Sequence, residues 1–364
     1  MKKLLLSSVA VLGLTAVATS ASANGLSLDL GGHYKGYVAL NDQDSPLADA
    51  REVDWLQETE LHFGGETTLD SGLTVGVHVE AEVDGGDNFG VDESYAYFAG
   101  SWGRINAGNE DGAAYLLQVA APSADSNVDG IRQFINPVNY AVTNTNVTTT
   151  IDYANDGINT LGATGDENRL TYLSPIFSGF QVGGSYTPDT GAVAAQNSAL
   201  LGVNADSTAY GSQYEAAARY EGTVSNIGFI AGAGYTETEL EAATAGLDDF
   251  QEWNAGLDLD FGAFGLGVVY TENNNGSAAN DTNETFVVGA DYTTGAFKLG
   301  ASYLTNENNG GGSTFEADRY TGGVVYSYGP GMSFRGSISY IDHAVTGGTD
   351  FDATSVLLGT QINF

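Results

Sequence analysis

Residues 354–364 form a segment in which apolar and polar side chains alternate. Successive side chains of a β-strand point to opposite faces, so this pattern predicts a strand with one apolar and one polar face. The apolar face carries Val356, Leu358, Thr360, Ile362 and Phe364. A soluble sheet would leave such a terminal strand as an exposed edge, whereas a closed barrel in a membrane would pair it with the first strand.

Segments of about ten residues with the same alternation recur throughout the chain, which is the pattern of transmembrane barrel strands. We count about sixteen of them, to within two. No segment approaches the roughly 18 consecutive apolar residues of a membrane-spanning helix. The pattern therefore predicts an all-β, antiparallel transmembrane β-barrel.

The connections between these segments alternate in length. Tight turns with Gly, Pro, Asn and Ser are predicted at 70–72, 100–103, 174–175, 225–226, 262–263, 293–295 and 329–331. Long polar loops are predicted at 41–51, 85–91, 110–166, 188–210, 238–249, 274–282, 307–314 and 343–350. Short turns on one rim and long loops on the other are typical of outer-membrane barrels, with the short turns periplasmic and the long loops extracellular.

Aromatic residues support the same interpretation. Five strands begin, after a short turn, with a phenylalanine: Phe180, Phe229, Phe264, Phe297 and Phe334. The same strands end, before a long loop, with a tyrosine: Tyr186, Tyr235, Tyr270, Tyr303 and Tyr340. We expect two outward aromatic girdles at the two membrane–water boundaries.

The N-terminus predicts export. Lys2 and Lys3 precede a short apolar run and a small-residue site at Ala21–Ala23, so we assign residues 1–23 to a signal peptide and 24–364 to one barrel. The chain has no cysteine, so it has no disulfide framework. Its formal charge of −35 makes nucleic acid an unsuitable partner and favours cations.

Basic residues are rare, and the aromatic residues show which side chains of each strand point outward. By this alternation, seven bases of the predicted strands fall on the inward, polar face. They predict a basic strip on the lumen wall, formed by Lys35, Arg104, Arg169, Arg219, Lys298, Arg319 and Arg335. The loop 110–166 is too long and too apolar in patches for a surface hairpin, so we expect it to fold into the barrel. Its acids Asp111, Asp125 and Asp129 would then face the basic strip.

Two pairs of inward acids, Glu58 with Glu60 and Glu80 with Glu82, are interpreted as lining a pore that attracts cations. Acid–base catalysis is the alternative, but no nucleophile or metal motif accompanies them. His33, His62 and His78 are inward on three consecutive strands. Their spacing matches no established ligand pattern, so we interpret them as pore-wall residues, with a metal or pH-responsive site as the alternative.

No cofactor is expected. The segment 84–93 is acidic and rich in glycine, and Asp84, Asp87 and Asp92 are weak candidates for calcium binding. The segment does not match the EF-hand pattern.

The segment 168–180, Asn-Arg-Leu-Thr-Tyr-Leu-Ser-Pro-Ile-Phe-Ser-Gly-Phe, resembles a hairpin of the bacterial general-diffusion porins, and Phe364 resembles their C-terminal assembly signal. The resemblance implies a sixteen-stranded, trimeric barrel whose third loop forms a constriction. It also implies that the inward bases other than Arg104 form the basic wall, and Asp111, Asp125 and Asp129 the acidic loop. Many porins have Gly-Arg after the fifth strand, where this chain has Gly108-Asn109, which predicts a less basic constriction.

The sequence thus predicts a porin for passive diffusion of ions and small hydrophilic solutes, with cations preferred, surrounded by outer-membrane lipid and lipopolysaccharide. Two alternatives differ in class. An outer-membrane enzyme acting on lipid would need a Ser–His pair on the lipid face. A surface adhesive β-protein would need its apolar faces buried between sheets.

Overall fold

The computed structural model describes residues 27–44, 48–83, 89–128, 131, 135–139, 167–190, 210–279, 281–310 and 312–364. The predicted signal peptide lies outside them. The strands are β1 (Ser27–Gln43), β2 (Val53–Thr68), β3 (Thr74–Glu82), β4 (Gly90–Gly100), β5 (Gly103–Glu110), β6 (Glu167–Leu173), β7 (Phe180–Thr187), β8 (Tyr210–Val224), β9 (Ile227–Leu240), β10 (Phe250–Phe261), β11 (Phe264–Asn273), β12 (Thr282–Thr294), β13 (Phe297–Gly310), β14 (Ser313–Gly329), β15 (Met332–Val345) and β16 (Phe351–Asn363). One helical turn, α1 (Ala113–Leu116), follows β5.

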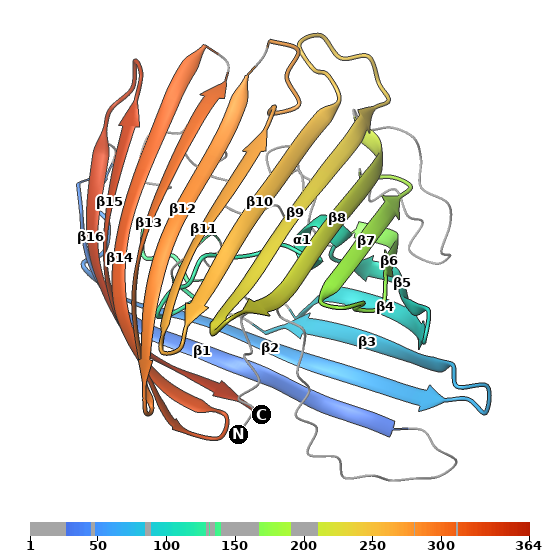
Figure 1. The fold of residues 1–364 in the computed structure, drawn as a ribbon. Coiled ribbons are helices and arrows are strands. Elements are labelled where there is room, and N and C mark those ends of the chain that lie inside the picture. Colours follow the sequence, from blue (N-terminus) through green and yellow to red (C-terminus); the bar gives the residue numbers. More distant parts are fainter. Residues whose placement is uncertain are drawn as a thin grey trace.

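The sixteen strands form one closed antiparallel barrel in which each strand pairs with its neighbours in sequence, as predicted (Figure 1). The barrel closes where β16 meets β1, with Val38 opposite Leu358. At the end of this pair, the Gly32 N–H donates to the Phe364 carbonyl over 3.0 Å, and the Phe364 N–H donates to the Gly32 carbonyl over 3.1 Å. The terminal strand therefore has no free edge, which removes the unpaired backbone groups that lipid could not satisfy.

The alternation of short and long connections is confirmed with one correction. The sequence predicts a long loop over 307–314, and this is wrong because β13 continues to Gly310 and β14 starts at Ser313. Glu307 is polar but remains in the ladder opposite Glu316. Beyond the membrane both faces of a strand meet water, so polar residues there do not indicate a loop.

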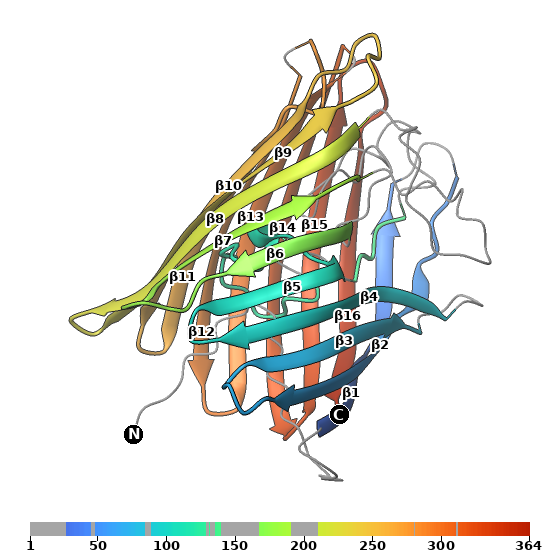
Figure 2. The same ribbon diagram turned by 90° about the vertical axis from the view of Figure 1, so that its right-hand side faces the viewer.

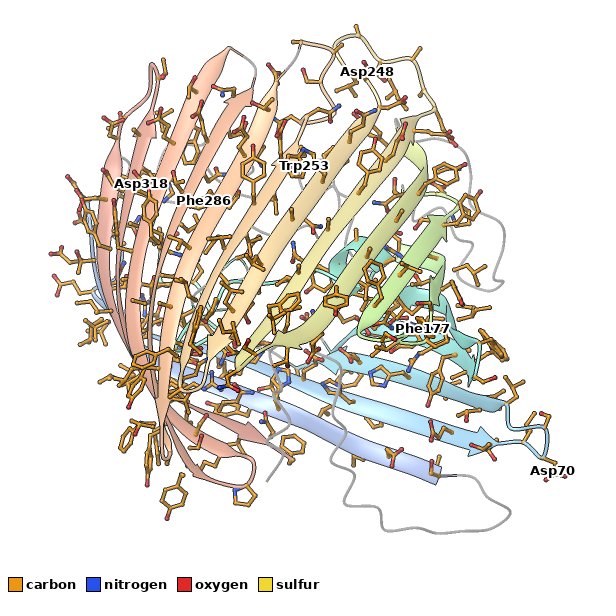
Figure 3. The ribbon with its side chains drawn as sticks, in the orientation of Figure 1. Asp70, Phe177, Asp248, Trp253, Phe286 and Asp318 are labelled. Atoms are coloured by element: carbon orange, nitrogen blue, oxygen red, sulfur yellow. The ribbon has the colours of Figure 1, made fainter. Side chains whose placement is uncertain are left out.

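The outer surface of the barrel is apolar between two aromatic girdles. Leu358 is 58 % exposed, and Leu266, Leu299 and Ile338 are also exposed on this surface. Trp253 and Phe286 mark the outer face (Figure 3). Rings of neighbouring strands pack against each other in tilted pairs at both ends. Their centroid separations are 4.6 Å for Phe264–Tyr292, 4.8 Å for Phe297–Tyr326, 4.9 Å for Trp253–Tyr270 and 4.9 Å for Tyr303–Tyr320. Such a band suits hydrocarbon flanked by two water interfaces.

The interior contains polar side chains and part of the connection between β5 and β6. The described part of this connection, residues 111–128 with 131 and 135–139, lies inside the barrel, and we call it the inward loop (Figures 1 and 2). This placement was predicted from its length and its apolar patches. Because the barrel is closed, the inward loop is surrounded by strands on every side.

Candidate functional site

The inward loop starts with backbone groups that the barrel wall satisfies. The Ala113 N–H donates to Ser185 Oγ over 2.8 Å, and the Ala114 N–H donates to Glu215 Oε2 over 3.0 Å. The other oxygen of Glu215 accepts a hydrogen bond from Arg169 Nη1 over 3.0 Å. The first N–H groups of a helix have no partner within it, so these wall side chains satisfy donors that would otherwise be unpaired. Two strands, β7 and β8, thereby hold α1 in place.

Beyond α1 the loop lies on inward glycines of consecutive strands. A Cβ at Gly256 would lie 2.4 Å from the Val119 carbonyl oxygen, one at Gly289 would lie 2.0 Å from the Pro122 carbonyl oxygen, and one at Gly300 would lie 2.4 Å from the Ala124 nitrogen. We define the glycine row as the residues that approach loop segment 117–124 in this way: Gly232, Gly256, Gly267, Gly289, Gly300 and Gly323. Only glycine allows two backbones to come this close.

The glycine row determines which side of the lumen the loop occupies. Its residues belong to β9–β14, and in the closed order of sixteen strands the wall opposite β11 is β3. Loop segment 117–124 therefore packs against this side, and the inward side chains of β2–β4 lie across the lumen from it. This asymmetry narrows the lumen to the space between the loop and β2–β4.

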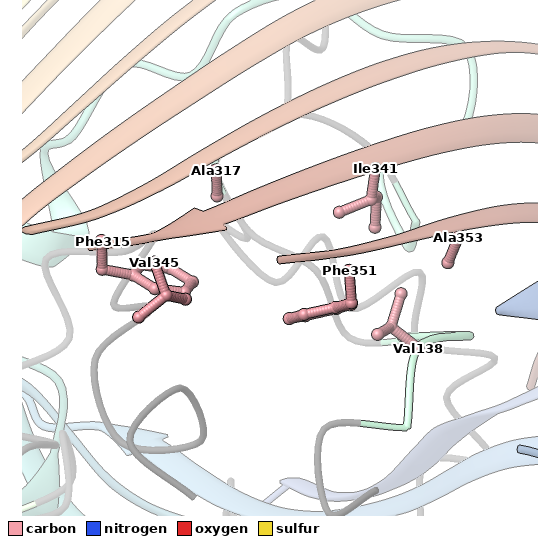
Figure 4. Close-up of a cluster of buried hydrophobic side chains, with 7 residues drawn as sticks. All are labelled: Val138, Phe315, Ala317, Ile341, Val345, Phe351 and Ala353. Atoms are coloured by element: carbon pink, nitrogen blue, oxygen red, sulfur yellow. The ribbon is translucent and has the colours of Figure 1, made fainter. Parts of the chain in front are cut away.

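Apolar contacts fix the middle and the end of the inward loop. Ala121 and Ile131 pack with wall residues Val269, Val287 and Leu304. Further along, Val128 and Ile135 pack with Tyr37, Ala39 and Leu357. Val138 completes a cluster with Phe315, Ala317, Ile341, Val345, Phe351 and Ala353 (Figure 4). Inward apolar residues of the wall are thus concentrated where the loop covers them, which keeps their surface out of water.

Asp125 attaches the inward loop to the wall at the barrel closure. Tyr37 Oη donates to Asp125 Oδ2 over 2.7 Å, and Arg335 Nη1 forms an ion pair with Asp125 Oδ1. Asn127 Nδ2 donates to Tyr37 Oη over 2.9 Å and to Gln361 Oε1 over 3.0 Å. Asp125 is only 1 % exposed. The Asp125 carboxylate therefore binds the loop to the barrel wall. It does not face a basic strip across an open gap, as the sequence analysis expected.

The seven bases of the sequence analysis all lie on inward positions, in two groups around the barrel. One group is on β5, β6 and β8 (Arg104, Arg169, Arg219), and the other is on β1 and β13–β15 (Lys35, Lys298, Arg319, Arg335). Most of them have a local partner. Lys35 Nζ donates to Glu58 Oε2 over 2.6 Å, and Lys298 Nζ lies 3.0 Å from Asp291 Oδ2.

Two further bases contact neutral or aromatic groups. Arg104 lies 4.1 Å from the ring centroid of Tyr97 and donates to Asn106 Oδ1 over 2.6 Å. Arg219 donates to the Gln118 carbonyl of the inward loop over 3.4 Å. Arg319 is 2 % exposed.

The predicted acids occupy different surroundings. Glu58 and Glu60 on β2, and Glu80 and Glu82 on β3, are on the wall opposite the loop. Asp111 is at the start of the inward loop and half-buried, whereas Asp129 lies outside the described residues. Of the calcium candidates, Asp84 and Asp87 also lie outside them, and the backbone carbonyl of Asp92 accepts a hydrogen bond from Asn109.

The sequence analysis missed a second set of inward acids towards the short-turn rim. We define the acidic patch as Glu221 on β8, Asp258 and Asp260 on β10, and Asp291 on β12. Glu221 and Asp258 are both opposite Ile230 of β9, and Asp260 and Asp291 are both opposite Gly265 of β11, so the four lie on alternate strands at similar height. Lys298 pairs with Asp291. The same parity rule that located the bases would have located these acids.

Other missed residues are those that hold the loop, namely Tyr37, Glu215, Ser185 and the glycine row. The available signal was the recurrence of inward glycines in the middle of consecutive strands, which leaves space for a second layer of backbone. Among the described residues, no helix is long and apolar enough to cross a membrane.

Comparison with known proteins places this geometry in a family. The family model described as Gram-negative porin matches residues 8–344. No curated protein sequence matches the chain.

Solved structures share the fold at low sequence identity. The anion-selective porin from Comamonas acidovorans has 17 % identity and a TM-score of 0.63, covering 93 % of this chain and 100 % of that one. In-vitro folded OmpT, an outer membrane protein of Vibrio cholerae in its trimer form, has 13 % identity and a TM-score of 0.60, covering 94 % and 100 %. A mutant of the Rh. blastica porin has 17 % identity and a TM-score of 0.57, covering 93 % and 100 %.

The family match extends over most of the chain, and the sixteen-stranded barrel with its inward loop agrees with it. The chain therefore belongs to the Gram-negative porin family, and it is a non-enzymatic channel protein of the outer membrane.

Proposed function

We propose that this porin lets ions and small hydrophilic solutes diffuse passively through its lumen, and that it prefers cations. The polar inner wall supports diffusion of hydrophilic solutes because it offers water and solutes hydrogen-bonding groups along the whole path. The inward loop limits solute size, since it occupies one side of the lumen along β9–β14.

The preference for cations is supported above all by the acidic patch. Four carboxylates lie together on the inner wall, and Lys298 is paired with Asp291. Across the lumen from the loop, Glu60 and Glu80 add negative charge, and their close neighbours include histidines. Fixed carboxylates in a narrow lumen raise the local concentration of cations over that of anions.

Elsewhere in the lumen, bases are compensated by acids. Arg335 is paired with Asp125, Arg169 with Glu215, and Lys35 with Glu58. The fold does not determine selectivity, because the Comamonas acidovorans porin with the same architecture is anion-selective. Selectivity has to come from the balance of inward charges, which in this chain favours carboxylates.

Single-channel recording in a planar bilayer tests the proposal. We expect open steps of an aqueous pore and, under a salt gradient, a reversal potential of the sign that indicates cation preference. The double variant Asp258→Asn/Asp260→Asn should shift the reversal potential towards zero, because two lumen charges are removed. Glu307→Gln is the matched control, since it removes a carboxylate from the outer surface, and it should leave the reversal potential unchanged.

Three results would contradict parts of the proposal. A folded wild-type barrel that does not conduct would overturn diffusion. Anion preference in the wild type would overturn the cation preference and with it the role of the acidic patch. Equal shifts in Asp258→Asn/Asp260→Asn and in Glu307→Gln would also argue against a local effect of the lumen charges.

We further propose that the protein is a homotrimer in the outer membrane, with its apolar band in contact with lipid and lipopolysaccharide. The broad exposed apolar surface supports this, because it must be covered by lipid or by other subunits. The long-loop rim would face the outside and the short-turn rim the periplasm. Mass measurement of the native complex in detergent tests the oligomeric state, and a monomeric mass would contradict the trimer.

A further inference from the structure

Three imidazole rings lie in a row on the inner wall formed by β1, β2 and β3. The ring centroids of His33 and His62 are 5.9 Å apart, and those of His62 and His78 are 5.7 Å apart. The register explains the row, because His33 is opposite Glu60 and His62 is opposite Glu80. His33 and His62 are therefore each next to a carboxylate of the neighbouring strand, whereas His78 is next to Glu80 of its own strand.

The most enclosed set in this row consists of His62, His78 and Glu80, all of which are buried. Glu80 Oε1 lies 2.5 Å from His78 Nε2 and 3.2 Å from His62 Nδ1. One potential ligand atom from each of the three residues lies within 4.8 Å of the others. Small side-chain rotations would bring all three atoms to the distance of about 2.0–2.2 Å at which such groups bind zinc.

The environment of His62 is unusual for a buried histidine. The residue is 8 % exposed, and neither ring nitrogen makes a hydrogen bond of good geometry. Nonetheless Nε2 is 2.8 Å from Glu60 Oε1, and Nδ1 is 3.2 Å from Glu80 Oε1. A neutral imidazole has only one N–H. The lone pair of its other nitrogen would therefore point at the lone pairs of a carboxylate oxygen, which is repulsive. A cation between the nitrogen and the carboxylate would replace this repulsion with two bonds.

We propose that His62, His78 and Glu80 form a binding site for a divalent transition-metal ion, such as Zn²⁺, on the inner wall of the barrel. Imidazole nitrogens combined with a carboxylate oxygen suit zinc and its neighbours, whereas calcium and magnesium prefer sites made of oxygen only. The three protein ligands leave a fourth position for water or for a solute in the lumen.

Neighbouring residues complete the site. Glu60 lies against His62 Nε2, and the ring of Tyr95 packs on His78 with a centroid separation of 5.4 Å. A carboxylate on the second nitrogen of a ligating imidazole orients the ring and increases its basicity. His33, Glu60 and His62 form a second group with suitable spacing. His33 Nε2, however, is already hydrogen-bonded to Glu58 Oε1 over 2.9 Å, so the buried set is the one we assign.

Calorimetric titration of ZnCl₂ into the full-length protein, purified in detergent and freed of chelator, tests the site. We expect one Zn²⁺ per chain. His62→Gln and His78→Gln should each weaken binding at least tenfold, since losing only an outer partner of a metal ligand costs about 10–100-fold. Glu80→Gln should have a similar effect. The titration measures no ion flow, so its failure is distinguishable from failure of the proposed channel function.

Two histidine variants serve as matched controls. His343 is on β15, where its ring stacks on Phe351 with a centroid separation of 4.4 Å, and His343→Gln should retain wild-type affinity. His33→Gln should also retain it. Circular dichroism confirms that each variant is a folded barrel. For the wild type, visible absorption bands of bound Co²⁺ report nitrogen ligation without any substitution.

Three results would overturn the site. These are a wild type that takes up no Zn²⁺ at millimolar concentration, equal affinities for His62→Gln and His343→Gln, and loss of binding in His33→Gln but not in His78→Gln. The first would indicate that a proton, and not a metal ion, separates His62 from its carboxylates. The third would move the ion to the other group.

Discussion

Arg335 on β15 and Asp125 in the inward loop form an ion pair between residues 210 positions apart in the chain. Tyr37 on β1 donates to the same carboxylate, so three distant segments meet at one buried acid. The inward loop is held at this point on the side of the barrel where β16 closes onto β1. These contacts fix the position of this part of the loop inside the barrel.

The Asp125→Asn variant should destabilise the folded protein. It removes one charge of a buried pair and leaves Arg335 uncompensated, which typically costs about 3–5 kcal/mol. Guanidinium unfolding in detergent measures the loss, and single-channel records should show larger current fluctuations because the loop is less firmly attached. The double variant Asp125→Asn/Arg335→Gln should recover most of the stability. A single variant as stable as the wild type would show that the pair does not hold the loop.

The Gly289→Ala variant should reduce the conductance. The added methyl group would lie 2.0 Å from the Pro122 carbonyl oxygen, so the loop has to move into the lumen. Overpacking of this kind costs about 1–3 kcal/mol. The control is Gly322→Ala, where the nearest atom, the Gly300 carbonyl oxygen, would be 3.9 Å away. Equal conductance in the two variants would mean that the glycine row does not position the loop.

The Glu307→Gln variant should stabilise the protein at low salt. Glu307 is directly opposite Glu284 on one side and Glu316 on the other, and like charges opposite each other destabilise a strand pair. We expect a gain of about 0.2–1 kcal/mol in unfolding free energy, which disappears near 1 M salt because the charges are screened.

The matched control for this effect is Glu237→Gln on the same outer surface. Glu237 is opposite Gln251 and Tyr214, so no like charge faces it across the ladder. This variant should show no gain at any salt concentration. If both variants gain equally, net charge and not the local pairing is responsible.

The Leu299→Lys variant should impair insertion into lipid vesicles. Leu299 is exposed on the outer face, and a charge near mid-bilayer on that face costs about 2–4 kcal/mol. The control is Lys298→Leu at the neighbouring position, whose side chain points towards the lumen. This variant loses only the half-exposed ion pair with Asp291, which is worth about 1 kcal/mol or less. The folding yield in vesicles compares the two variants. Equal yields would contradict the assignment of faces.

The period-2 pattern predicts the fold well because each strand has one face in hydrocarbon and one facing the lumen. Leu266 and Leu358 are exposed outside, and Arg169 and Arg335 are inside, as their parity requires. The pattern fails beyond the membrane, where both faces meet water. Glu307 therefore resembles a loop residue although it is in a strand.

The interior could be predicted only in part. Parity places Glu58 and Arg219 on the inner face but does not tell which partner each will find around the lumen. Asp125 is an example, because nothing near it in the sequence indicates Tyr37 or Arg335 as its partners. The register of β1, β2 and β3 brings His33, His62 and His78 into one row, and the sequence pattern does not specify that register.

The hydrogen bonds between Gly32 and Phe364 have a consequence for biogenesis. When the chain crosses into the periplasm from its N-terminus, β1 arrives long before β16. Until β16 pairs with it, the edge of β1 exposes unpaired backbone groups to which another extended polypeptide could bind. Closure joins the first and the last strand, and pairing between segments so far apart in sequence is intrinsically slow.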